Sequence, residues 1–326
     1  MRSALAKRAA SFKAMTYAKS TQKSYSTHLK RYLQFCGLYG YQPVPATTEQ
    51  LECYVAYLAI SLSYASIKNY INIVRILHLN DGYDNPIQDN FGIKCVLNGV
   101  KRTKGSVSQK MLPITPAILT KLYHSLDLDT NVQDVMFWGA CMLGFWGFLR
   151  KSNLFAPSSK GFDHNIHLSR QDISYSPKAK RILVNVHKSK TIQYKERELI
   201  CVLPAVRGIL CPVRAIISVL LATPTVGPQA PLFVLPTVTG WKPYLYHAFT
   251  TKLRTTLETV GIPSSDYASH SLRRGAATWA AHVGLEGDQI RCLGDWHSDA
   301  YLGYIDRTIN DKHHLLTKMA SAVPCS

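Results

Sequence analysis

Apolar residues recur every three or four positions through the first hundred residues, the spacing that places side chains on one face of a helix. Four helices are predicted there, over residues 16–35, 48–58, 63–79 and 91–100. Ser20 or Thr21 can cap the first of them, and the YQPVP stretch from Tyr41 to Pro45 ends it. The pattern predicts a small helical domain over residues 1–108, with basic outer faces.

A polar, basic stretch from Lys101 to Lys110 has the composition of a linker. The second domain is predicted over residues 109–326. Its first helix opens at Thr115, an N-cap residue that is followed by proline at the first helical position. Residues 135–149 are almost wholly apolar but fewer than the roughly 20 that span a bilayer. They predict a core helix that ends at Arg150, and no membrane partner is expected.

Three short segments that are rich in β-forming residues predict a small antiparallel sheet, from residues 172–173, 181–187 and 198–203. Residues 188–193 connect the last two of these strands. Further helices are predicted over residues 212–221 and 244–260, with an irregular, proline-rich loop at 224–236, and the chain from Ser269 to its end is predicted to be helical. The fold class is therefore mainly α with a small antiparallel β-sheet.

Charge points to the kind of partner. Lysine and arginine number 38 against 20 acidic residues, which gives a net charge of +18. An excess of this size favours a polyanionic partner, most often nucleic acid. The eight cysteines include no C-x-x-C pair, and no Cys/His cluster has the spacing of zinc ligands. No metal site is predicted.

Several residues could act on a phosphate. His270 and Arg273 lie three positions apart, which places both on one helix face. Arg150 follows the apolar segment, and the forked guanidinium of arginine suits two phosphate oxygens. Tyr301 and Tyr304, also three apart, offer two candidate nucleophiles.

The order of four segments resembles the tyrosine recombinase (phage integrase) family. The segments are GFLRKSNL, LSRQDISYSP leading to HKSKT, HSLRRGAATW, and LGDWHSDAYLGYI. The resemblance covers residues 112–309 and, more loosely, the helical N-terminal domain. The wording of GFLRKSNL, LCPVRAI and SDAYLGYI is most similar to the eukaryotic Crypton and DIRS-type transposon recombinases.

The resemblance implies a role for particular residues. The catalytic set falls on Arg150, Lys190, His270, Arg273, Trp296 and the nucleophile Tyr304. Lys188 and His297 are the alternatives for the hairpin lysine and the tryptophan. Tyr304 is preferred over Tyr301 because an apolar residue follows it and because of its separation from Trp296. The family usually has an acidic residue shortly after the first arginine, where this chain has Asn153.

The resemblance also implies an activity and an assembly. The expected protein has a helical core-binding (SAM-like) domain and a catalytic domain, and acts as a site-specific DNA recombinase or transposase through a 3′-phosphotyrosyl intermediate, without a cofactor. It is expected as a homodimer on each double-stranded DNA site and a homotetramer in the synapse. The expected location is the nucleus, or the cytoplasm for a prokaryotic source. A type IB topoisomerase and a transposase-derived DNA-binding regulatory protein without catalysis remain as alternatives.

Overall fold

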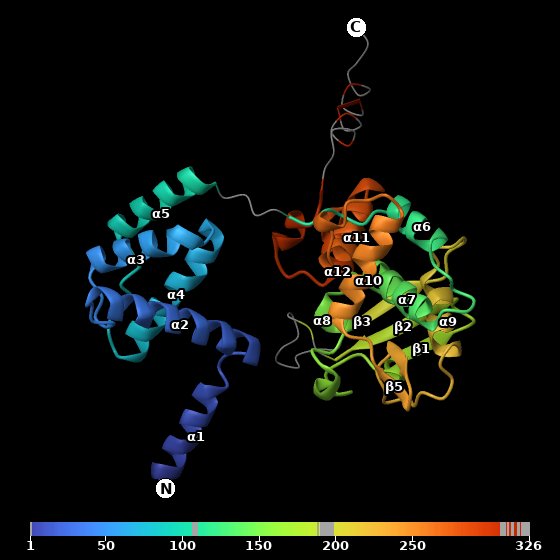
Figure 1. Ribbon diagram of the computed structural model, residues 1–326, viewed down its shortest axis with the longest axis horizontal. Helices are drawn as coiled ribbons and strands as arrows, with labels where there is room; N and C mark the ends of the chain where they lie inside the picture. Colours follow the sequence, from blue (N-terminus) through green and yellow to red (C-terminus); the bar gives the residue numbers. More distant parts are fainter. Residues whose placement is uncertain are drawn as a thin grey trace. The chain divides into compact units, whose positions relative to one another are not determined.

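Figure 1 shows the computed structural model of the chain. It describes residues 2–105, 110–187, 189 and 199–306, with isolated positions between 311 and 320. The chain divides into two units, Met1–Gln109 and Lys110–Ser326. In the described part of the chain, no helix combines the length and the apolar character that crossing a membrane would require.

The N-terminal unit is helical throughout. Its elements are α1 (Arg2–Ala14), α2 (Lys19–Tyr39), α3 (Thr48–Ser61), α4 (Tyr64–Asn80) and α5 (Phe91–Lys104). Helices α2 to α5 enclose an apolar core in which Tyr32 and Tyr54 meet edge to face, with ring centroids 5.0 Å apart. Side-chain oxygens of Thr47, Ser63 and Asn90 cap α3, α4 and α5. Local capping therefore sets where these three helices begin.

The four helices predicted in this unit are present, with three differences. Helix α1 is unexpected, and its described side chains are all exposed. The predicted cap at Ser20 or Thr21 is wrong, because α2 begins directly after Ala18, whose side chain makes no capping bond. Helix α5 extends through Lys104, so the first four residues of the predicted linker are helical. Gly105, with φ at 72°, follows the end of the helix.

The C-terminal unit combines helices with two small sheets. Its helices are α6 (Pro116–His124), α7 (Val132–Trp146), α8 (Lys151–Leu154), α9 (Pro212–Leu221), α10 (Tyr246–Thr259), α11 (His270–His282) and α12 (Gly287–Gly294). Helix α7 is buried from Asp134 to Phe145 and packs against α9, α10 and α11 (Figure 1). A helix that is apolar on all sides can only lie inside a core. Helix α11, which carries His270 and Arg273, is one of the helices that pack against it.

The predicted antiparallel sheet is confirmed. It has the order β1 (Ile173–Ser176), β2 (Arg181–Val186), β3 (Leu199–Pro204), with Val184 opposite both Ile173 and Cys201. A second sheet of two strands, β4 (Val234–Thr237) and β5 (Gly240–Pro243), begins inside the predicted irregular loop. The mainly α fold class with small antiparallel sheets is thus correct.

Two predicted features of this unit are wrong. The apolar segment does not remain helical to Arg150, because α7 ends at Trp146 and Phe148 takes a left-handed conformation, with φ at 50°. The chain after Ser269 is not helical throughout either. Gly284, with φ at 88°, separates α11 from α12, and residues Asp299–Gly303 form a 3-10 helix, η4.

Candidate active site

Arg273 is the centre of the candidate site. It lies on α11 and is only 2% exposed. Its Nη1 donates to the carbonyl of Phe148, and its Nη2 donates to the carbonyl of Gly294 at 2.6 Å. The guanidinium is therefore fixed between the turn after α7 and the end of α12. Its Nε is buried and has no hydrogen-bond partner among the described residues.

Arg150 adds a second positive charge to the site. It is the N-cap residue of α8, and its backbone N–H donates to Oδ1 of Asn153 at 3.1 Å. Asn153 is buried, so its amide oxygen can hold this backbone without bringing an uncompensated charge into the core. Asparagine thus takes a supporting position where the sequence resemblance leads one to expect an acidic residue. Burial, and then the charge of Arg150, lower the pKa of Arg273 to about 10.

His270 begins α11, three residues before Arg273. Its ring is exposed on one side and lies nearly parallel to the ring of Tyr304, at 22° with centroids 6.4 Å apart. Partial burial, and then the positive charges of Lys151, Arg273 and Arg150, lower the pKa of His270 below 6.5. The imidazole is therefore neutral at pH 7 and able to accept a proton.

Trp296 lies against Arg273. The centre of the guanidinium lies 4.0 Å from the centroid of its ring, a cation–π contact. The indole is 8% exposed, and its Nε1 is buried without a partner among the described residues. A β-carbon on Gly294 would come within 1.6 Å of the indole ring, so only glycine fits beneath it. The end of α12 is thus shaped to receive Trp296.

Tyr304 closes the site. It follows η4, and its ring lies 5.2 Å from that of Trp296 and 5.4 Å from the guanidinium of Arg273. The rival Tyr301 lies 6.4 Å from Trp296, and its hydroxyl points to α12, because it would be 2.3 Å from a β-carbon on Gly287. Of the two tyrosines, Tyr304 is thus the one placed beside both Arg273 and His270.

Three candidates remain. Lys190 and Lys188 fall outside the described residues. His297 is exposed, and its Nε2 lies 3.8 Å from Oδ1 of Asp295. Among the residues the structure describes, no cluster of histidine, cysteine and acidic side chains could hold a metal ion.

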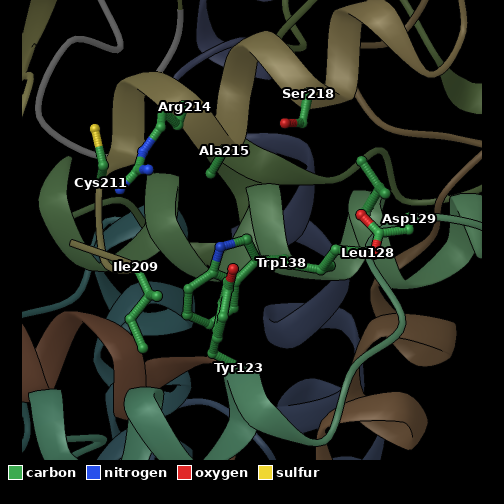
Figure 2. A pocket seen from close by; sticks show the side chains of 10 residues that line it. Tyr123, Leu128, Asp129, Trp138, Ile209, Cys211, Arg214, Ala215 and Ser218 are labelled. Atoms are coloured by element: carbon green, nitrogen blue, oxygen red, sulfur yellow. The ribbon is translucent and has the colours of Figure 1, made fainter.

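A concave pocket of about 200 Å³ lies in a different part of the same unit (Figure 2). Tyr123 and Trp138 meet edge to face on its wall, and Arg214 and Cys211 come from the start of α9. None of the predicted catalytic residues lines it. This pocket is therefore separate from the cluster around Arg273.

Two polar residues on α11 that the sequence did not single out contact the segment after η4. The hydroxyl of Thr278 donates to the carbonyl of Tyr304 at 3.3 Å and accepts from the N–H of Asp306 at 3.0 Å. Arg274 pairs with the carboxylate of Asp306 at 3.4 Å. The i, i+4 spacing of Arg274 and Thr278 was the available signal, although it occurs in most helices and identifies nothing alone.

The chain shares its fold with solved recombinases. Residues 5–80 match the family described as phage integrase, N-terminal SAM-like domain. The integrase/recombinase xerD homolog of Selenomonas ruminantium is 23% identical over 279 residues, which cover 82% of this chain and 76% of that protein.

Three solved structures extend the likeness to nearly the whole chain. The Tn1549 transposon integrase in complex with transposon right end DNA has a TM-score of 0.64 at 14% identity, covering 94% of this chain and 95% of its own. A lambda integrase dimer bound to a COC′ core site has a TM-score of 0.59 at 13% identity, and the match covers 94% of this chain and 95% of that chain. The XerH recombinase bound to palindromic difH has a TM-score of 0.62 at 14% identity, and the match covers 92% of this chain and 79% of that chain. The predicted fold, a SAM-like domain followed by a recombinase-like domain, is confirmed.

Proposed function

We propose that this chain is a site-specific DNA recombinase of the tyrosine recombinase (phage integrase) family, which cuts and rejoins strands through a 3′-phosphotyrosyl intermediate. One observation carries the proposal. Two buried donors, Nε of Arg273 and Nε1 of Trp296, lie beside Tyr304 with no acceptor among the described residues. An unpaired buried donor costs roughly 1–3 kcal/mol, so such donors at one point favour an anionic ligand.

The two arginines are the proposed phosphate clamp. Negative charge grows on the non-bridging oxygens of a phosphodiester as it is attacked, and fixed guanidinium groups stabilise that charge. Arg273 is already held by two backbone carbonyls, so little reorganisation is needed when the phosphate binds. Burial, and then the charge of Arg150, lower the pKa of Arg273, and a bound phosphate would relieve the repulsion between the two guanidinium groups.

Tyr304 is the proposed nucleophile. Its phenol oxygen forms a bond to phosphorus while the bond between phosphorus and the 5′-oxygen breaks, and the phenolic proton passes to the neutral imidazole of His270. The departing 5′-oxygen takes a proton from Lys190, or from Lys188. The products are a 3′-phosphotyrosyl bond and a free 5′-hydroxyl. The reverse reaction with another 5′-hydroxyl rejoins the strand, and neither direction needs a metal ion or ATP.

Phosphate entry requires one movement within the site. Both orphan donors are buried, and the ring of Tyr304 lies over the guanidinium of Arg273 at 5.4 Å. We therefore expect the Tyr304 side chain to rotate away from Arg273 when the phosphate binds. Rotation of an exposed or half-buried side chain is fast compared with a typical catalytic step.

The N-terminal unit is proposed to bind the same DNA through its lysines. The ammonium groups of Lys68 and Lys101 each lie 5.9 Å from the centroid of Tyr64, and Lys104 lies near the end of the same helix as Lys101. Such a cluster of cations suits contacts with a DNA backbone. The DNA complexes of the structurally similar integrases support the same partner.

The kind of recombinase, its cellular location and its assembly are proposed from short sequence segments and from the family resemblance. The similarity of GFLRKSNL and SDAYLGYI to Crypton and DIRS-type elements favours a transposon recombinase that acts in the nucleus, whereas the bacterial relative favours the cytoplasm of a prokaryote. A homodimer on each site and a homotetramer in the synapse are part of the same proposal.

The test uses nicked duplexes that tile the genomic DNA flanking the coding sequence. A nick close to the cleavage point lets the short 5′-hydroxyl fragment leave, so that the covalent adduct accumulates and survives detergent. Wild type and Tyr301→Phe are expected to form the adduct, and Tyr304→Phe is expected to form none. Binding without any adduct would favour the alternative, a DNA-binding regulatory protein without catalysis.

A further inference from the structure

We infer that Thr278 and Arg274 are positioning residues for Tyr304. They attach the backbone of the nucleophile to α11, the helix that also carries His270 and Arg273. The inference rests on the proposed function, because it concerns how the nucleophile of that reaction is held.

Thr278 contacts the nucleophile's own peptide groups. Its hydroxyl hydrogen points to the carbonyl of Tyr304, and its oxygen accepts the N–H of Asp306, so a single side chain satisfies two backbone groups. The N–H of Tyr304 donates to the carbonyl of Tyr301 at 2.8 Å. Both backbone polar groups of Tyr304 are therefore fixed, one within η4 and one by α11.

Arg274 reinforces the same attachment. Its side chain is 12% exposed and its Nη2 lies 3.4 Å from Oδ1 of Asp306, two residues after the nucleophile. Its Nε is buried with no partner among the described residues, so the pair with Asp306 is the contact that accounts for a cation at this depth. A charge that is mostly withdrawn from water is held in place more firmly than one on a long exposed side chain.

The positions along α11 explain why one helix can do both tasks. His270 and Arg273 lie at i and i+3 on the face that meets Trp296 and Tyr304. Arg274 and Thr278 lie at i and i+4 on the adjoining face. The distance between the phosphate clamp and the nucleophile's backbone is therefore set by one rigid element.

Such an attachment is needed because η4 cannot hold its own shape. A 3-10 turn of five residues has weak hydrogen-bond geometry and no length to stabilise it. The Tyr304 side chain must also rotate to admit a phosphate. With residues 304 and 306 fixed by α11, the rotation is confined to the side chain and returns the phenol oxygen to one position.

The experiment compares single-turnover adduct formation on the nicked duplex that traps wild type. Thr278→Val keeps the shape of the side chain and removes both hydrogen bonds, whereas Thr278→Ser keeps the hydroxyl. Thr255→Val is the matched control, because Thr255 is an exposed helical threonine whose hydroxyl bonds only to the carbonyl of Thr251. Asp306→Asn removes the ion pair at a partly exposed position, so it tests the idea without disturbing the core.

Thr278→Val is expected to slow adduct formation on the order of 10- to 100-fold, the cost of a nucleophile displaced by about 1 Å. Thr278→Ser should react within about threefold of wild type, and Asp306→Asn should lie between the two. DNA affinity and melting temperature should match those of the Thr255→Val control. Equal rates for Thr278→Val, Asp306→Asn and the control would overturn the inference.

A second substrate separates positioning from leaving-group chemistry. With sulfur in place of the 5′-oxygen at the cleaved bond, the departing thiolate needs no general acid. Thr278→Val should remain slow on this substrate, because its nucleophile is still misplaced, and full recovery would contradict the inference. A Tyr304→Phe variant that still forms the adduct would instead contradict the proposed function itself, whatever Thr278→Val does.

Discussion

Two buried arginines of the C-terminal unit invite comparison. Arg170 is 9% exposed and Arg273 is 2% exposed, each donates through both Nη atoms, and each leaves a buried Nε without a partner among the described residues. Arg170 bonds to the carbonyl of Thr223 at 2.8 Å and to its hydroxyl. Arg273 bonds to the carbonyls of Phe148 and Gly294. By burial and hydrogen bonding, the two side chains are nearly alike.

Their neighbours differ. Burial alone lowers the pKa of Arg170, whereas burial and the charge of Arg150 act together on Arg273. Both of the hydrogen bonds of Arg170 go to one residue at the end of α9, which is how an arginine ties two segments together. Arg273 instead lies against an indole and a phenol whose rings are 5.2 Å apart, near a second arginine and a histidine. A buried arginine thus becomes a candidate for chemistry through the charges and rings around it, not through its depth.

The largest expected difference is in the chemical step. Arg273→Lys keeps a positive charge but loses the fork that bonds to two carbonyls, so adduct formation should fall on the order of 100- to 1,000-fold. Arg170→Lys should leave the rate per folded molecule within about threefold of wild type. Single-turnover cleavage of the nicked duplex, normalised to active protein by DNA binding, measures both. Similar losses in the two variants would remove the distinction between the two arginines.

The second prediction concerns folding stability, and here Arg170 is the arginine whose replacement is expected to have the effect. Arg170→Ala removes both side-chain hydrogen bonds to Thr223, whose carbonyl still accepts the N–H of Val226, and should lower the free energy of unfolding by about 2 kcal/mol. Thermal denaturation followed by circular dichroism gives the shift in melting temperature. A variant as stable as wild type would show that water replaces the guanidinium at no cost, and Arg170 would then have no structural role.

A smaller effect is expected from the ring that covers Arg273. Trp296→Phe keeps an aromatic face against the guanidinium and against Phe148 but removes the Nε1 donor. Adduct formation should fall about tenfold, the worth of one hydrogen bond to a charged group. DNA affinity should be unchanged. An undiminished rate would mean that the orphan donor of Trp296 does not contact the phosphate.

The smallest expected effect is a shift in pH dependence. Burial lowers the pKa of His270 below 6.5, and nearby positive charges lower it further, with Lys151 the largest contributor among them. Lys151→Gln should therefore raise this pKa and move the acid limb of the rate profile to higher pH, by less than about one unit. The profile is measured at subsaturating DNA, where it reports on the free protein. An acid limb that stays in place, or moves to lower pH, would contradict a proton transfer to His270.

The sequence predicted most of the helices and the three-stranded sheet because their apolar periods are long and their caps are local. It missed α1, which has no apolar face, and the β4–β5 hairpin, whose strands have only four residues each and include prolines. The predicted end of α7 was wrong for a related reason. Apolar residues continue through Leu149, and only the left-handed Phe148 reveals the turn.

The candidate site was predictable as a set of residues but not as an arrangement. Ordered motifs suggested Arg150, His270, Arg273, Trp296 and Tyr304. Trp296 stacks on Arg273, and Thr278 holds the nucleophile's backbone, and both are contacts between residues distant along the chain. Such contacts depend on how α11 and α12 pack, which no local pattern encodes.

The most direct test of the account is to identify the amino acid bonded to DNA. The adduct trapped on the nicked duplex is digested with nuclease and protease, and the modified peptide is sequenced by mass spectrometry. We expect a 3′-phosphonucleotide on Tyr304, with Tyr301 unmodified in the same peptide. A nucleotide on Tyr301, or on any residue other than Tyr304, would contradict the placement of the reaction beside Arg273 and His270.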